Sequence, residues 1–219
     1  MKHALAGFYS CYDNRVSTSS ESTTPDAVAQ DSDSSRVHRF RTAFLDRDGV
    51  INRKLPEGEY VSSWQRFVLL PGTAQAIARL NREGLRVVVV TNQRGIALGK
   101  YTAEAVREIH NNFQRELADH GAHVDAFYFC PHDRNLCDCR KPLPGMFLQA
   151  QRDFPDIHPS TSCMIGDSLS DIEFGRALGL FTVFIAGDPL HRKPGAEKAI
   201  QMADSVVENL PDAVRLMLA

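Results

Sequence analysis

The chain reads RTAFLDRDGVIN at residues 41–52, an apolar run that ends abruptly in acidic residues and a glycine. The apolar half predicts a short buried strand over residues 41–46. In open α/β sheets, the groups that carry out chemistry follow the carboxyl ends of the strands. We therefore expect the carboxylates of Asp46 and Asp48 to lie together at one edge of a sheet.

Apolar runs of strand length recur along the chain and alternate with helical patterns. In residues 85–91, LRVVVVT, four valines follow one another without alternation, which is typical of a parallel strand covered on both faces. Other strands are predicted at residues 124–129, 162–165, 180–185 and 205–207, and helices at residues 73–83, 103–120, 144–153, 169–178 and 212–218. This alternation predicts an α/β fold with a doubly wound, mostly parallel sheet.

Composition and charge narrow the class of protein. The chain has 219 residues, 43% of them hydrophobic, and a formal net charge of -2. These values suit one folded domain and offer no global positive field for nucleic acid or an anionic membrane. No apolar run reaches the roughly 18 residues that span a bilayer, and the first residues lack the apolar core of a signal peptide. We expect a monomer that binds a small molecule, with no nucleic-acid or membrane partner.

The first 38 residues differ in composition from the rest. Residues 13–36 are dense in Ser, Thr and Asp and contain no aromatic residue, so they cannot bury enough surface to offset the entropy of ordering. We predict a disordered tail at residues 1–38 and a single domain at residues 39–219. A start codon assigned too far upstream would give the same pattern.

Polar residues follow four strand ends, in the order Asp46-Arg-Asp48-Gly, Thr91-Asn-Gln, Arg140-Lys141 and Gly166-Asp167. A carboxylate such as Asp46 can attack phosphorus in line, which divides a very slow hydrolysis into two easier steps. Asp48 lies two residues further along an extended backbone and so points to the same side. It can protonate the leaving oxygen and then activate water.

Cations are needed at such a site, because carboxylates repel a phosphoryl group. A hard Mg²⁺ ion held by Asp46, Asp167 and oxygen from backbone or water meets that need. Lys141 and the Thr91 hydroxyl can bind the remaining phosphoryl oxygens. Taken singly, each motif also fits a turn, a solvated loop or a helix cap. The ordered set at four strand ends favours a site for phosphoryl transfer.

In order and spacing, the set resembles the four motifs of the haloacid dehalogenase (HAD) superfamily of phosphotransferases, matched here by Asp46-x-Asp48, Thr91, Lys141 and Gly166-Asp167-x-x-x-Asp171. The resemblance implies a Rossmann-like fold, with Asp46 as the nucleophile and Asp48 as the general acid and base. It implies phosphate binding by Thr91 and Lys141. Magnesium would be held by Asp46, Asp167 and the backbone carbonyl of Asp48, and Asp171 would support the site without touching the metal.

Three cysteines and a histidine lie close together before Lys141. They are spaced C-x-H-x4-C-x-C, at Cys130, His132, Cys137 and Cys139, and supply the four soft ligands of a closed tetrahedral zinc site. The alternative is a set of core or disulfide-bonded cysteines, but the polar loop at residues 130–139 offers little core. We predict a structural Zn²⁺ ion that stiffens this loop, in the reducing cytoplasm.

The zinc loop resembles a narrower family when it is taken with two further segments, Cys139-Arg-Lys-Pro-x-Pro-Gly-Met and Thr91-Asn-Gln-x-Gly-Ile-Ala-x-Gly. From about residue 40 to the C-terminus the chain is similar to the D-glycero-D-manno-heptose 1,7-bisphosphate 7-phosphatases and to their relatives, the histidinol-phosphate phosphatases. The resemblance implies that no separate cap domain is present. It also implies that Arg140 contacts the distal part of the substrate, with help from Asn92, Ser168 and residues 57–60.

Two positions depart from this family. Arg94 stands where these proteins usually have Ser, and Leu98 stands where they usually have Arg. Two interpretations are open. Either the cation has moved from one end of the turn to the other and Arg94 contacts an anionic group of the substrate, or the Arg94 side chain is solvated.

Four functions stay open on the sequence alone. The leading hypothesis is a hydrolase that removes the 7-phosphate of a heptose bisphosphate through a phospho-aspartyl intermediate. The rivals are hydrolysis of histidinol phosphate, a zinc-stabilised binding module without turnover, and phosphoryl transfer to an acceptor other than water. The presence of every acidic residue that the mechanism needs argues against the binding module, and phosphate release without an added acceptor would argue against transfer.

Overall fold

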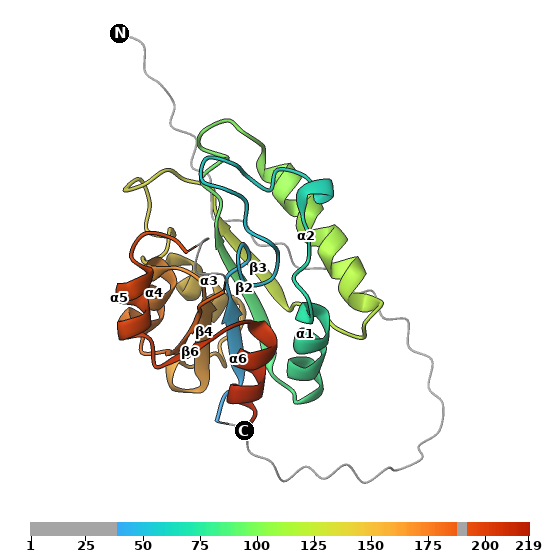
Figure 1. Cartoon of the computed structure of the whole chain (residues 1–219), viewed down its shortest axis with the longest axis vertical. Helices are drawn as coiled ribbons and strands as arrows, with labels where there is room; N and C mark the ends of the chain where they lie inside the picture. The colour runs from blue at the N-terminus through green and yellow to red at the C-terminus, as the bar shows by residue number, and fades with distance from the viewer. Residues whose placement is uncertain (1–38, 188–191) are drawn as a thin grey trace.

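The computed structural model describes residues 39–187 and 192–219, and Figure 1 shows helices on both sides of a central sheet. The strands pair in parallel in the order β3-β2-β1-β4-β5-β6. Their bounds are β1 (Thr42–Leu45), β2 (Arg86–Asn92), β3 (Ala126–Cys130), β4 (Ser162–Gly166), β5 (Phe181–Ile185) and β6 (Ser205–Val207). The predicted doubly wound sheet is confirmed. Because the chain runs outward from β1 in both directions, the carboxyl end of β1 lies at the point where the strand order reverses.

Among the described residues, five α-helices connect the strands and α6 follows the last strand. Their bounds are α1 (Thr73–Arg82), α2 (Ala103–Ala118), α3 (Gly145–Asp153), α4 (Leu169–Leu178), α5 (Ala196–Met202) and α6 (Leu210–Met217), with short 3-10 turns at Trp64–Arg66 and Pro159–Thr161. The sequence did not predict α5. This helix has only seven residues, and its N-cap is Gly195 in a left-handed conformation, with no side-chain cap. It therefore lacks both the length and the start signal on which such a prediction depends.

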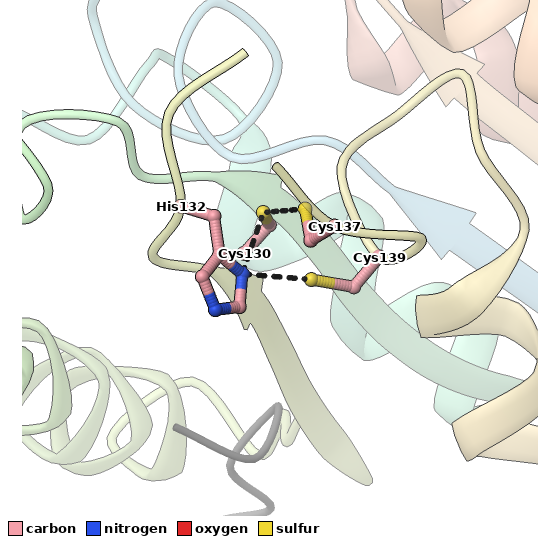
Figure 2. A group of neighbouring side chains, drawn as sticks. All are labelled: Cys130, His132, Cys137 and Cys139. Atoms are coloured by element: carbon pink, nitrogen blue, oxygen red, sulfur yellow. Dashed lines mark hydrogen bonds between the residues drawn. The ribbon is translucent and has the colours of Figure 1, made fainter. Parts of the chain in front are cut away.

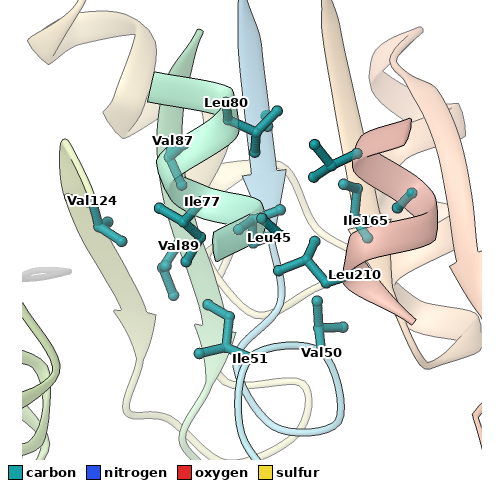
Figure 3. Close-up of a cluster of buried hydrophobic side chains, with 14 of the residues drawn as sticks. Leu45, Val50, Ile51, Ile77, Leu80, Val87, Val89, Val124, Ile165 and Leu210 are labelled. Carbon is teal, nitrogen blue, oxygen red and sulfur yellow. The ribbon is translucent and has the colours of Figure 1, made fainter. Parts of the chain in front are cut away.

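The sheet is buried on both faces, which explains its uninterrupted apolar strands. Alternate residues of β1 point to opposite sides, so Leu45 packs with Ile77 of α1 and Leu210 of α6 (Figure 3). On the other face, the ring of Phe44 lies 5.3 Å from that of Phe147 in α3. The valines of β2 divide between the same two clusters. A strand with both faces covered needs no polar alternation.

The loops after β1 and β3 carry the segments that border the site. The loop after β1 holds only a 3-10 turn and isolated bridges at Asn52, and the loop after β3 holds the cysteine cluster. Within residues 39–187 and 192–219 neither forms a separate cap domain. No helix in these two ranges has the length and apolar character needed to cross a membrane. The predicted tail at residues 1–38 and the segment Asp188-Pro-Leu-His191 lie outside the described residues.

Candidate active site

The carboxyl ends of β1, β2 and β4 and the loop after β3 meet at one buried lysine. The Nζ atom of Lys141 lies 2.9 Å from Asp46 Oδ1 and 2.6 Å from Asp171 Oδ1, and it donates to the Val90 carbonyl at 2.6 Å. Lys141, Asp46 and Asp171 are all buried. The structure therefore brings together side chains that are up to 125 residues apart in the sequence. This was expected, because the carboxyl ends of parallel strands lie at the same edge of a sheet.

Burial and charge shape the protonation of this cluster. Burial raises the pKa of Asp46, against the opposing charge of Lys141. Burial also acts to lower the pKa of Lys141, but the charges of Asp171 and Asp46 outweigh it, so the pKa of Lys141 is raised. Lys141 therefore stays cationic at neutral pH and can neutralise negative charge beside Asp46.

Three carboxylate side chains lie close together at this edge of the sheet. Asp46, Asp167 and Asp171 each offer an oxygen, and these atoms lie within 4.8 Å of one another. Hard oxygen donors at this spacing fit a Mg²⁺ ion. Gly49 lets the turn after β1 come close, because it has φ +104° and a Cβ there would lie 2.3 Å from Asp167 Oδ2. Lys54 and Lys193 donate to the same Asp167 carboxylate at 3.1 and 2.9 Å.

Three donor side chains hold the carboxylate of Asp48. Arg47 Nη2 contacts both of its oxygens at 3.1 and 2.9 Å, Asn52 donates at 2.9 Å and Gln93 donates at 3.1 Å. Burial acts to raise the pKa of Asp48, but Arg47 and these hydrogen bonds outweigh it and lower the pKa. The carboxylate is thus fixed in orientation and ionised at neutral pH.

A cavity of about 650 Å³ adjoins this cluster on the side of Asp167. Its lining includes Gly49 and Asp167 from the site, with Arg53, Lys54 and Arg192 as nearby cations. The cavity therefore offers room for a ligand beside the carboxylates, and its wall carries both basic and acidic side chains.

The side chains of Asn92 and Ser168, predicted to help bind substrate, make contacts within the protein. The Asn92 amide donates to the Lys141 carbonyl at 3.1 Å and accepts from the Lys141 backbone N–H at 3.0 Å. It thereby joins the end of β2 to the loop that carries Lys141. The Ser168 hydroxyl donates to Asp171 Oδ2 at 2.6 Å, in a capping box at the start of α4. A substrate contact from either residue stays a prediction.

The two arginines lie near the zinc loop. Arg94 pairs with Asp133 through two contacts, Nε to Oδ1 at 2.5 Å and Nη2 to Oδ2 at 3.4 Å. This pair, which the sequence did not predict, ties the segment after β2 to the loop after β3. The positive charge of Arg140 also helps to lower the pKa of Asp133. The Nη1 atom of Arg140 is buried and has no hydrogen-bond partner among the described residues. A buried donor without a partner destabilises the protein, so Arg140 is suited to donate a hydrogen bond to an anion or a water molecule.

The predicted zinc ligands form one cluster (Figure 2). Cys130 Sγ lies 3.5 Å from Cys137 Sγ and 3.7 Å from His132 Nδ1, and that nitrogen lies 3.3 Å from Cys139 Sγ. Zinc bonds of about 2.0–2.3 Å in tetrahedral geometry place ligands roughly 3.4–3.8 Å apart. The cysteines form no disulfide, and hydrogen bonding from Cys139 lowers the pKa of Cys130 to about 5, despite burial. The cluster fits a closed zinc site.

Sequence reasoning missed several residues of the site. Gln93 and Arg47 contact Asp48, and Lys54 and Lys193 contact Asp167. Gln93 and Arg47 belong to the motifs that follow the first two strands. A polar side chain in such a motif could have been predicted to contact the site. Lys193 comes from the segment before α5, and nothing in its local sequence indicates that it reaches this edge of the sheet.

The comparisons with known proteins agree with this geometry. A family model described as HAD-hydrolase-like matches residues 138–213. The D-glycero-alpha-D-manno-heptose-1,7-bisphosphate 7-phosphatase of Mycobacterium bovis is 48% identical over 131 residues, which is 59% of this chain and 68% of that protein. The D-glycero-beta-D-manno-heptose-1,7-bisphosphate 7-phosphatase of Escherichia coli is 37% identical over 182 residues, which is 78% of this chain and 93% of that protein.

A solved structure shows the same fold. The D,D-heptose 1,7-bisphosphate phosphatase from B. bronchiseptica, complexed with magnesium and phosphate, aligns with a TM-score of 0.71 and 32% identity. The alignment covers 82% of this chain and 98% of that one. With relatives matched over nearly their whole length, the chain belongs to the heptose-1,7-bisphosphate 7-phosphatase family of HAD-like hydrolases.

Proposed function

We propose that the protein is a magnesium-dependent phosphatase that removes the 7-phosphate of D-glycero-D-manno-heptose 1,7-bisphosphate. The observation that carries the proposal is the buried meeting of Asp46 and Lys141, 2.9 Å apart, with Asp167 close to the same nucleophile. A carboxylate beside a fixed cation and a set of metal-binding oxygens is suited to attack on phosphorus.

The proposed reaction has two steps. In the first, an oxygen of Asp46 attacks phosphorus and the bond from phosphorus to the sugar oxygen breaks. Asp48, whose protonated form is favoured once the negatively charged phosphate binds beside it, gives its proton to that oxygen. In the second, Asp48 takes a proton from water, the water oxygen attacks phosphorus, and Asp46 leaves as a free carboxylate. Lys141 and Thr91 hold the phosphoryl oxygens through both steps.

Asp46, Asp167 and the backbone carbonyl of Asp48 would hold a magnesium ion, and the carboxylates of Asp46 and Asp167 lie within 4.8 Å of each other and of Asp171. When bound, Mg²⁺ offsets the charge that repels a phosphoryl group from these carboxylates. Asp171 already pairs with Lys141 at 2.6 Å. That contact supports its role in positioning the lysine.

Cationic side chains near the site favour a substrate that carries a second phosphate. Arg140 has a buried Nη1 atom free of hydrogen-bond partners among the described residues, and the cavity beside Asp167 is lined by Arg53 and Arg192. The relatives named above act on a heptose that carries two phosphates. Histidinol phosphate offers only one phosphate to these cations, so we rank it second.

The proposal is tested by measuring phosphate release, with and without Mg²⁺, from both anomers of the heptose 1,7-bisphosphate and from histidinol phosphate. Both anomers belong in the assay because the relatives differ in the anomer that they are named for. We expect kcat/KM for the better anomer to exceed that for histidinol phosphate by at least about 100-fold, a difference of about 2.7 kcal/mol in transition-state binding. Equal, feeble rates on all three substrates would contradict the substrate assignment.

We also propose that the zinc cluster stiffens the loop that delivers Arg140 and Lys141. Replacement of Cys137 by Ser is expected to lower the zinc content and, by about 2 kcal/mol or more, the stability, so that Tm falls by roughly 4–8 °C. Zinc is measured by elemental analysis and Tm by thermal unfolding.

The matched control for this prediction is Cys163→Ala. Cys163 is a buried thiol packed against Met217, outside the cluster. Its replacement is expected to leave the zinc content unchanged. One zinc per chain in the Cys137→Ser protein would exclude Cys137 as a ligand.

A further inference from the structure

Gln93 lies between the acid/base group and a phosphate-binding residue, and its side chain uses every hydrogen-bonding position that an amide has. Gln93 is 2% exposed. Its Oε1 atom accepts from the Tyr101 hydroxyl at 2.7 Å and from Arg47 Nη2 at 3.3 Å. Its Nε2 atom donates to Asp48 Oδ2 at 3.1 Å and to Thr91 Oγ1 at 2.9 Å. Two donors and two acceptors fill the capacity of the amide.

These partners fix which way the amide points. Arg47 can only donate and the Asp48 carboxylate can only accept, so the oxygen of Gln93 must face Arg47 and its nitrogen must face Asp48 and Thr91. Because the Thr91 oxygen accepts from Gln93, the hydrogen of the Thr91 hydroxyl is left to donate elsewhere. In the proposed reaction, its acceptor is a phosphoryl oxygen of the substrate.

Packing and burial fix the Tyr101 hydroxyl in its contact with Gln93. It precedes α2, and its ring fills the space above Gly95, where a Cβ would lie 2.1 Å from a ring carbon. A second ring, that of Tyr60, lies 5.8 Å away. Burial raises the pKa of Tyr101, so its hydroxyl stays protonated and remains a donor to Gln93.

We propose that Gln93 is a positioning residue that sets the geometry of both Asp48 and Thr91, and that the Tyr101 hydroxyl holds Gln93 in the required orientation. The inference rests on the proposed function, because Asp48 and Thr91 must act on a phosphoryl group for their position to matter. Arg47 and Asn52 also hold Asp48, whereas Gln93 joins it to Thr91.

The test compares two leaving groups. The sugar oxygen of heptose 1,7-bisphosphate needs a proton from Asp48 as it leaves, whereas the oxygen of 4-nitrophenyl phosphate leaves without one. Because kcat/KM covers the steps up to departure of that oxygen, a misplaced Asp48 lowers it mainly for the sugar substrate.

Tyr101→Phe removes one hydroxyl and keeps the ring. We expect kcat/KM to fall about 5- to 10-fold on the bisphosphate and less than about 2-fold on 4-nitrophenyl phosphate, a fraction of the full effect of general acid catalysis. Gln93→Met keeps the length of the side chain without its hydrogen bonds. We expect a loss of about 50-fold or more on the bisphosphate and a smaller loss, through Thr91, on the aryl ester.

The matched control is Tyr128→Phe, which removes a buried hydroxyl that contacts Asp153 at 2.8 Å, away from the site. This change is expected to lower Tm without altering the ratio of kcat/KM between the two substrates. Equal losses on both substrates in Tyr101→Phe, or no loss on either, would overturn the inference. Failure of the proposed function looks different, since the unmodified protein would then hydrolyse heptose 1,7-bisphosphate no better than it hydrolyses histidinol phosphate.

Discussion

Replacement of Asp46 by asparagine is expected to reduce phosphate release by at least about 10⁴-fold, since loss of a covalent nucleophile removes the route through the intermediate. An amide cannot attack phosphorus, although it has the shape of the carboxylate. The fold should persist, because burial already disfavours the charged form of Asp46 and Lys141 keeps Asp171 as its partner. Phosphate release and thermal unfolding measure the two expectations separately.

The comparison variant for Asp46→Asn is Asp156→Asn. Asp156 has a side chain that is 70% exposed and pairs with Arg86 at 2.9 Å. Arg86 begins β2, at the end of the strand opposite to the site. This variant should keep the full rate, because an exposed ion pair contributes little to stability. If the Asp46→Asn protein kept even a tenth of the rate, nucleophilic catalysis by this residue would be wrong.

The fold was largely predictable because its signals are local. The four consecutive valines of β2 predict a strand covered on both faces, and the structure divides them between two core clusters. α4 was predicted from its apolar pattern, and Ser168 caps it as Asp and Ser residues commonly do. α5 was missed because seven residues carry too little periodicity to stand out.

The sequence predicted the site residues that follow strand ends, but not the contacts made between loops. Asp46, Lys141 and Asp167 each follow a strand or its loop, and parallel topology brings such positions to one edge. The pairing of Arg94 with Asp133 depends on how two loops of unpredictable conformation meet. The sequence could show that these residues were charged. Only the arrangement in space shows that Arg94 ties the two loops together.

The largest expected effect on stability comes from Lys141→Met, which removes the cation between Asp46 and Asp171. Lys141 lies 2.9 and 2.6 Å from these two carboxylates, and all three side chains are at most 8% exposed. Removing one partner of a buried ion pair leaves an uncompensated charge and typically costs about 3–5 kcal/mol. We expect a loss of that size in urea unfolding, together with at least about a 100-fold loss of kcat.

The loss of stability in Lys141→Met should depend on pH. Burial raises the pKa of Asp46 and Lys141 opposes this rise, so removing Lys141 raises the pKa further. A carboxyl group with a raised pKa in the folded state loses stability as the pH rises through that pKa. The deficit should therefore be larger at about pH 8 than at about pH 5, because protonation at the lower pH removes the unpaired charge.

Lys198→Met is the matched control for Lys141→Met. Lys198 also pairs with a carboxylate, Glu173 at 3.0 Å, but its side chain is 60% exposed. Its removal should cost less than about 1 kcal/mol, because water screens an exposed pair. If Lys141→Met cost no more than Lys198→Met, or if its deficit were the same at both pH values, the carboxylates would not depend on this lysine. The buried pairing that supports attack by Asp46 would then lack its energetic basis.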